Sequence, residues 1–205
     1  MRFNGRRRPL RLVSSITIAA TLCLAADKPA FHPKPAEQYT AKQTSSGVTI
    51  GAEPYTTDDQ AKAPFGKLNP WQYNILPVLV VIHNTSPNAI RVENARFEYE
   101  LPDGTKIEAT PASDVKYSRG PSAPKAKIGP LGGVRVGRGK NPLAAPEIEV
   151  RAFSAKVIPA GDTASGFVYF ETDVASAGAQ LYITGLSDAV TGKELFFFEF
   201  PLSGK

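Results

Sequence analysis

Apolar and polar residues alternate at every second position over much of this chain, the period of a β-strand rather than a helix. The clearest case is residues 95–101, where four apolar side chains alternate with arginine and glutamate. This pattern predicts a strand with one buried face and one solvent face. Asp103-Gly104 follows as a turn, and residues 106–109 are the predicted returning strand.

Other segments carry weaker strand signals. Residues 78–82 are apolar without a break, as in a central strand, and Pro77 marks where that strand should become regular because proline cannot donate to a ladder. Within residues 147–158 the apolar parity changes by one position, which is typical of a bulge or of a strand that crosses between sheets. The remaining predicted strands are residues 48–52, 165–172, 179–185 and 193–202.

These segments predict an all-β fold. About eight strands, separated by Pro, Gly, Asn and Asp, favour a single antiparallel β-sandwich, whereas a parallel sheet would need helical crossovers. One short helix is expected near residues 56–63, because Thr57 and Gln60 have the spacing of a capping box. Residues 111–146 lack strand alternation and are rich in Gly and Pro, so they are predicted as a long, mobile insertion.

Two stretches carry a family resemblance. "VLVVIHNTSPNAIRVENARFEYELPDG" and the later "VIPAGDTASGFVYF" resemble small bacterial extracytoplasmic immunoglobulin-like domains of uncharacterised function. The resemblance covers residues 75–110 and 153–202, and its motifs concern the fold. It implies an exported immunoglobulin-like β-sandwich and brings no active site with it. The basic insertion is longer than such domains usually have.

The N-terminus has the organisation of a secretory signal peptide. Five arginines precede residues 12–26, a segment with no charged residue that ends in small residues. Fifteen residues at about 1.5 Å each do not cross a hydrocarbon core of about 30 Å, so a stable membrane span is not expected. We therefore predict that residues 1–26 are removed on export, and that the mature protein is periplasmic or extracellular. Cys23, the only cysteine, offers a lipidation site as an alternative, although the bulky Leu22 precedes it.

The signal peptide also changes the charge balance. It holds five of the 24 lysines and arginines, so the remaining 19 equal the 19 acidic residues. A neutral mature chain does not favour binding to nucleic acid. Residues 27–45 contain three prolines and are predicted as a flexible spacer, with packing along the edge of the domain as the alternative. The predicted sandwich domain is then residues 46–205.

The residues that usually carry chemistry are few. The histidines are His32 and His83, and no catalytic or phosphate-binding motif is complete. Paired glutamates such as Glu98 and Glu100 fit a solvated strand face better than an acid–base pair. Asn84-Thr-Ser matches a glycosylation sequon, which the bacterial character makes irrelevant. We therefore predict no enzymatic activity, no cofactor and no metal site.

Positive charge concentrates in the insertion. Between residues 116 and 146 there are seven cations and no acid, which leaves the rest of the mature chain at −7. This segment is either a loop kept soluble by its charge or a surface that holds an anionic lipid, a cell-wall polymer or an acidic partner. The candidate residues are Lys116, Arg119, Lys125, Lys127, Arg135, Arg138 and Lys140.

The aromatic residues near the C-terminus offer a second candidate. Phe196, Phe198 and Phe200 share one parity, so Phe197 should lie on the opposite face. An outward Phe197 marks either a partner-binding patch or a residue covered by the insertion.

The sequence as a whole favours an exported, non-catalytic binding or envelope-structural module that contacts another protein. The alternatives are a basic-loop anchor to the membrane surface or the cell wall, and an accessory domain of a hydrolase or a cryptic hydrolase.

Overall fold

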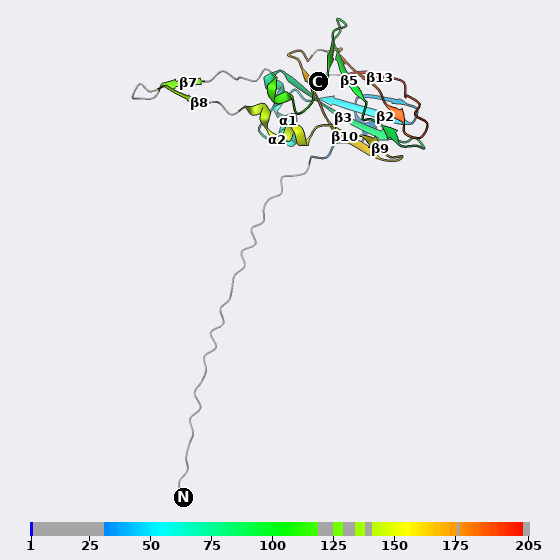
Figure 1. Cartoon of the computed structure of the whole chain (residues 1–205), viewed down its shortest axis with the longest axis horizontal. Coiled ribbons are helices and arrows are strands. Elements are labelled where there is room, and N and C mark those ends of the chain that lie inside the picture. Colours follow the sequence, from blue (N-terminus) through cyan, green and yellow to red (C-terminus); the bar gives the residue numbers. More distant parts are fainter. Residues whose placement is uncertain (2–30, 119–124, 129–133, 138–140, 176, 203–205) are drawn as a thin grey trace. The chain divides into compact units, whose positions relative to one another are not determined.

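A computed structural model describes Met1 and residues 31–118, 125–128, 134–137, 141–175 and 177–202. Within these residues the chain forms an antiparallel β-sandwich, as the alternating pattern predicted (Figure 1). The described residues contain thirteen strands, many of them short, rather than the expected eight or so. None of the described helices has the length and apolar character needed to cross a bilayer.

The first sheet has the strand order β1-β2-β3-β10. Every neighbouring pair in it is antiparallel, and β3 lies between β2 and β10, paired with both from Val78 to His83. Nine of the ten residues of β3 are buried, because both faces of this sheet are covered. The strands are β1 (Ala41–Ser45), β2 (Val48–Pro54), β3 (Ile75–Asn84) and β10 (Thr163–Glu171).

The second sheet packs on one face of the first and has the order β13-β11-β5-β6. Its inward side chains, among them Phe97, Tyr99, Leu181 and Ile183, share one apolar core with the facing residues of β2, β3 and β10. The predicted turn at Asp103-Gly104 joins β5 to β6. The strands are β5 (Arg96–Glu100), β6 (Lys106–Glu108), β11 (Gln180–Thr184) and β13 (Phe198–Pro201).

Helices cover the other face of the first sheet and create a second core. Phe167 and Tyr169 of β10 lie in this core with Phe65 and Ile148. Figure 1 shows α1 and α2 beside each other at this face. The covering elements are α1 (Asp58–Phe65), α2 (Pro146–Val150) and the 3₁₀ turns η1 (Ala36–Gln38), η2 (Pro70–Tyr73), η3 (Val115–Tyr117) and η4 (Pro142–Ala144).

The smaller strands complete the fold. A three-stranded sheet has the order β12-β4-β9, and β7 pairs with β8 as a hairpin. Their bounds are β4 (Ile90–Arg91), β7 (Lys125–Ile128), β8 (Val134–Gly137), β9 (Val157–Ile158) and β12 (Ser187–Asp188).

The expectation that residues 111–146 lack regular structure is wrong for the described parts. They include the β7–β8 hairpin, and Val115 and Leu143, near the two ends of this segment, are buried in the second core. Apolar anchors at both ends fix the segment to the domain because their burial removes apolar surface from water.

The capping box predicted for the helix is confirmed. The Thr57 hydroxyl accepts a hydrogen bond from the Gln60 backbone N–H, and the Gln60 side chain accepts from the Thr57 N–H. These two bonds satisfy donors that the first turn of α1 leaves without a partner inside the helix.

The predicted spacer is wrong for residues 31–45, which belong to the domain. Strand β1 pairs along its whole length with residues Val48 to Ala52 of β2. Ala36 and Tyr39 are buried, and the Phe31 ring centroid lies 5.7 Å from that of Phe167. The pattern was weak because the outward side chains of β1 are polar and its buried residue is a small alanine. Residues 27–30, the signal peptide and Cys23 lie outside the described residues.

A second correction concerns residues 147–150, which form most of α2 instead of a strand. Pro146 occupies the first helical position, where its fixed φ favours a helix and its missing N–H has no effect. Ile148 is buried against β10, and the Tyr169 hydroxyl donates to its carbonyl oxygen at 2.8 Å. The parity change after this segment therefore marks the end of a short helix rather than a bulge.

The C-terminal strand begins at Phe198, two residues later than Phe196. Phe198 and Phe200 lie in the core, but Phe196 precedes the strand and is 73% exposed, so the prediction that all three share the core is wrong. The outer edge of β13 lies beside β1, where the Glu199 N–H donates to the Gln43 side-chain oxygen at 2.6 Å.

Asn84 closes the end of β3. Its side chain is fully buried, and its amide nitrogen donates to the carbonyl oxygens of Asn88, Ile158 and Pro159 at 2.8, 3.0 and 3.1 Å. Its side-chain oxygen accepts from the Ser86 N–H and hydroxyl at 3.0 and 2.6 Å. The asparagine of the sequon is thus a structural residue whose nitrogen is occupied in the folded domain.

Candidate interaction face

The second sheet turns one face to the core and the other to solvent. Alternation along β5 and β11 buries Phe97, Tyr99, Leu181 and Ile183 and places their sequence neighbours on the outside. We call this solvent face the Tyr182 face. It consists of Arg96, Glu98, Glu100, Lys106, Glu108, Gln180, Tyr182, Thr184, Phe197 and Glu199.

Tyr182 lies at the centre of this face. The strand register places it directly opposite Glu98 of β5 on one side and Glu199 of β13 on the other. The Phe197 ring lies against it, with centroids 5.4 Å apart and ring planes inclined by 33°. Phe197 is 49% exposed, so the two rings form an apolar surface that water still reaches.

Lys106 also contacts the tyrosine ring. Its ammonium lies 4.3 Å from the centroid of the Tyr182 ring. The same nitrogen is 3.3 Å from Glu100 Oε2 and 3.5 Å from Glu98 Oε2. The hydrogen bond to Glu100 is the main cause that raises the pKa of Lys106 above its usual value, so this residue stays a cation at every physiological pH. A cation over a ring and two carboxylates together restrict the Tyr182 side chain.

The face carries an excess of negative charge. Its four glutamates face one lysine and one arginine, and Lys106 already contacts two of the glutamates. Among the described residues, no cation lies within 4.0 Å of the Glu108 or Glu199 carboxylate. Two carboxylates are therefore available to a positively charged group of a partner.

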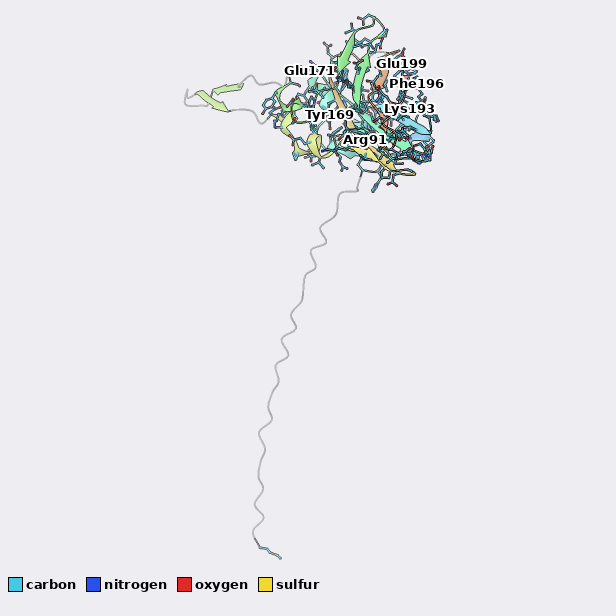
Figure 2. The ribbon with its side chains drawn as sticks, turned by 45° about the vertical axis from the view of Figure 1, so that its right-hand side comes forward. Arg91, Tyr169, Glu171, Lys193, Phe196 and Glu199 are labelled. Atoms are coloured by element: carbon cyan, nitrogen blue, oxygen red, sulfur yellow. The ribbon has the colours of Figure 1, made fainter. Side chains whose placement is uncertain are left out.

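Phe196 is a second exposed phenylalanine and is the sequence neighbour of Phe197. Both side chains precede β13 and are exposed, and Figure 2 labels Phe196 and Glu199 on this side of the domain. Phe196 also lines a small cavity of about 180 Å³ with Pro87, Ile90 and Leu195. Consecutive exposed phenylalanines are unusual because large apolar side chains are generally buried.

The site residues predicted from the sequence lie in two places, Phe197 on the second sheet and the basic residues in the segment 116–140, which begins at the helical face of the first sheet. Phe197 lies on the solvent face, as its parity predicted, and its role in binding stays a prediction. Lys116 is at the helical face, where its ammonium lies 3.7 Å from Glu149 Oε1 and 5.3 Å from the centroid of the Tyr117 ring.

The other predicted basic residues have little structural description. Lys125, Lys127 and Arg135 belong to the β7–β8 hairpin, whose register places Lys127 opposite Arg135. Arg119, Arg138 and Lys140 lie outside the described residues. The predicted binding role of this basic segment therefore stays a prediction.

The residues considered for chemistry are occupied by structural contacts. His83 Nδ1 lies 2.5 Å from Glu37 Oε1, and this hydrogen bond is the main cause that lowers the pKa of Glu37. Glu98 and Glu100 contact Lys106. Within the described part of the chain, no group of three or more His, Cys, Asp and Glu side chains could hold a metal ion.

Sequence reasoning found Phe197 but missed Tyr182 and Lys106. The parity of residues 180–184 already places Tyr182 outward, so its exposure could have been predicted. Its contact with Lys106 could not, because Lys106 belongs to β6, which is separated from β11 by β5 in the sheet and is distant from it in the sequence.

No protein-family model and no curated protein matches the chain. Among solved structures it is similar to a Bacillus subtilis protein provisionally named a lipoprotein, with 14% identity and a TM-score of 0.40 over 80% of this chain and 39% of that one. It is also similar to a DUF4426 family protein of Pseudomonas aeruginosa, with 9% identity and a TM-score of 0.32 over 78% and 92% of the two chains. The chain thus spans about two fifths of the Bacillus protein. At these TM-scores neither likeness decides the fold or the function.

Proposed function

We propose that this chain is an exported, non-catalytic module of the cell envelope, with an immunoglobulin-like sandwich that binds another protein through the Tyr182 face. The observation that carries the proposal is the half-exposed Phe197 ring, which lies against Tyr182 on a sheet whose strands are all paired. A rigid aromatic pair on a paired sheet loses little conformational entropy on binding, as interface anchors do.

The apolar gain available at this site is substantial. A phenylalanine side chain buries about 150–250 Å², so covering the exposed 49% of Phe197 removes about 100 Å² from water. At about 25 cal/mol per Å² this contributes about 2.5 kcal/mol before the costs of association. Phe196 is more exposed and adds a contribution of at least similar size. These two residues are the expected centre of the interface.

The charges around the rings select the partner. Glu108 and Glu199 are the two glutamates of the Tyr182 face that have no cation within 4.0 Å among the described residues. The partner surface should therefore combine an apolar anchor with lysine or arginine at its rim. Four strands about 4.8 Å apart and about 17 Å long present a smaller area than the about 800 Å² per side of a stable interface. The partner therefore extends beyond the sheet onto the Phe196 segment.

Site-specific photo-crosslinking tests this function. We would place p-benzoylphenylalanine at position 197 of the full chain, in the cell that naturally produces it, and identify the adducts by mass spectrometry. The matched control places the same residue at Val150, which is 78% exposed on α2 and far from the second sheet in the fold. We expect a discrete adduct with another envelope protein from position 197 and its absence from position 150.

Two variants strengthen the test. Tyr182→Ala and Glu199→Lys should each reduce the yield of the position-197 adduct, because the first removes the ring beneath Phe197 and the second opposes the basic rim of the partner. The proposal fails when positions 197 and 150 give the same adducts. Adducts that contain only this chain would contradict binding to another protein and favour a structural role.

A further inference from the structure

A cavity lined by both polar and apolar groups lies on the first sheet, away from the Tyr182 face. Strands β1 and β2 pair from Ser45↔Val48 to Ala41↔Ala52, and beyond this last pair the two segments separate. The chain before β1 turns into η1, whereas β2 continues along β3 and then leads into α1. The space between them is a cavity of about 380 Å³. Small side chains at Ala41 and Ala52 lie at the point of separation and line the cavity.

The two walls carry opposite charges. Lys34, Gln38 and Thr40 come from the N-terminal wall, and Glu53, Thr57 and Gln60 come from the β2–α1 wall. Among the described residues no ion pair within 4.0 Å involves the Lys34 ammonium or the Glu53 carboxylate. One cation and one anion thus line the same cavity without neutralising each other.

Hydrogen bonds fix both walls before any ligand enters. On the N-terminal wall the Lys34 backbone N–H donates to the Tyr39 hydroxyl at 3.1 Å, and Tyr39 packs directly over Gly51. On the opposite wall the Gln60 side-chain nitrogen donates to the Pro54 carbonyl oxygen at 3.4 Å and ties α1 to the end of β2. A site built on such fixed elements loses little entropy when a ligand binds.

The volume and the charges indicate the class of ligand. A volume of 380 Å³ lies at the lower end of the range for ligand sites and corresponds to about a dozen water molecules. A simple anion would be attracted by the Lys34 ammonium but repelled by the Glu53 carboxylate. A simple cation would be attracted by Glu53 but repelled by Lys34. A neutral molecule would desolvate both charges and leave them unpaired, which is unfavourable.

We propose that this cavity binds a small zwitterion that carries an ammonium and a carboxylate group, such as an amino acid or a dipeptide. The ligand carboxylate pairs with the Lys34 ammonium, and the ligand ammonium pairs with the Glu53 carboxylate. The Thr40 hydroxyl and the Gln38 amide are available for the backbone polar atoms between the two charges. This site is independent of the Tyr182 face, so the failure of one proposal leaves the other intact.

Calorimetric titration of the full chain with three related probes tests the proposal. The probes are Ala-Ala, N-acetyl-Ala-Ala, whose ammonium is blocked, and Ala-Ala amide, whose carboxylate is blocked. Each charged hydrogen bond contributes about 1.5–3 kcal/mol, so each blocked probe should bind about 10- to 100-fold more weakly than Ala-Ala.

Charge-neutral variants identify the two walls. Lys34→Met should bind Ala-Ala and Ala-Ala amide with equal affinity, whereas Glu53→Gln should stop distinguishing Ala-Ala from N-acetyl-Ala-Ala. Lys156→Met removes an exposed lysine that does not line the cavity and serves as the matched control. A thermal melt verifies that each variant is folded.

Three results would overturn the assignment. They are undetectable Ala-Ala binding at concentrations of about 10 mM, equal binding of all three probes to the unmodified chain, and an equal loss of binding in Lys34→Met and Lys156→Met. The second result would indicate a site for neutral polar molecules.

Discussion

Replacing Asn84 with alanine removes the hydrogen bonds that join the end of β3 to two loops. In the folded chain the amide nitrogen serves the carbonyl oxygens of Asn88, Ile158 and Pro159, and the amide oxygen serves Ser86. Asn84→Ala leaves these groups without their partner. The Asn84 side chain and its bond to the Ile158 carbonyl are buried, whereas water can partly reach the groups of Ser86, Asn88 and Pro159. The resulting loss of unfolding free energy therefore measures the cost of leaving these polar groups without a hydrogen bond.

The expected magnitude follows from the contacts. Each buried polar group that loses its partner costs about 1–3 kcal/mol, and part of this is recovered when the loops relax. We expect Asn84→Ala to lower the free energy of unfolding by about 3–4 kcal/mol, a large part of the 5–15 kcal/mol of a typical domain. For a domain of this size the melting temperature should fall by about 6–16 °C.

Urea unfolding measures the effect directly. The only tryptophan, Trp71, provides the fluorescence signal, and an unchanged slope of unfolding free energy against urea shows that the comparison is valid. Asn94→Ala is the matched control because Asn94 is exposed, and it should change the stability by less than about 0.5 kcal/mol. The reasoning is refuted when Asn84→Ala costs less than about 1 kcal/mol.

Three further predictions follow from contacts at other places in the fold. A Cβ atom at Gly51 would lie 2.5 Å from a backbone oxygen of η1, so Gly51→Ala should cost about 1–3 kcal/mol and speed amide hydrogen exchange in residues 36–45; unchanged exchange would disprove this docking. The hydrogen bond to His83 lowers the pKa of Glu37, so this carboxylate stabilises the folded state above the unfolded pKa of glutamate. The stabilisation is lost as the pH falls through the lower pKa of the folded state, so Glu37→Gln should reduce the fall of the unfolding free energy at acid pH, as measured by urea unfolding. An unchanged fall at acid pH would exclude the Glu37–His83 pair as its source. Phe198→Ala should cost about 3–5 kcal/mol because the side chain is fully buried, whereas Phe197→Ala should change the melting temperature little, and equal losses would mean that Phe197 is a core residue.

Sequence pattern alone was sufficient where local and tertiary signals agree. The strict alternation of residues 95–101 predicted β5, and the unbroken apolar run predicted that β3 is central. The capping box at Thr57 predicted the start of α1. In each case the side chains that define the element also determine which of its faces is buried.

The pattern failed where a contact across the fold decides the structure. The five residues of α2 are too few for helical periodicity, and their Ile and Val at alternate positions resemble a strand until Ile148 finds its place beside β10. Residues 31–45 were predicted as a spacer because nothing in their own sequence shows that they pack on the domain. The space that Tyr39 fills is left by Gly51 of β2, which has no side chain.

The candidate sites divide in the same way. The alternation of residues 196–200 was sufficient to predict that Phe197 faces outward, because this prediction needs no information from other strands. The cavity between Lys34 and Glu53 and the contact of Lys106 with Tyr182 both need segments that only the folded sheet order brings together.

The hydrogen bond between Gln43 and Glu199 has a consequence for how the chain reaches its fold. It joins a strand near the start of the domain to the last strand of the sandwich, 156 residues later. Such distant pairing is slow to form. We therefore expect the contact between β1 and β13 to be among the last to form when the domain folds.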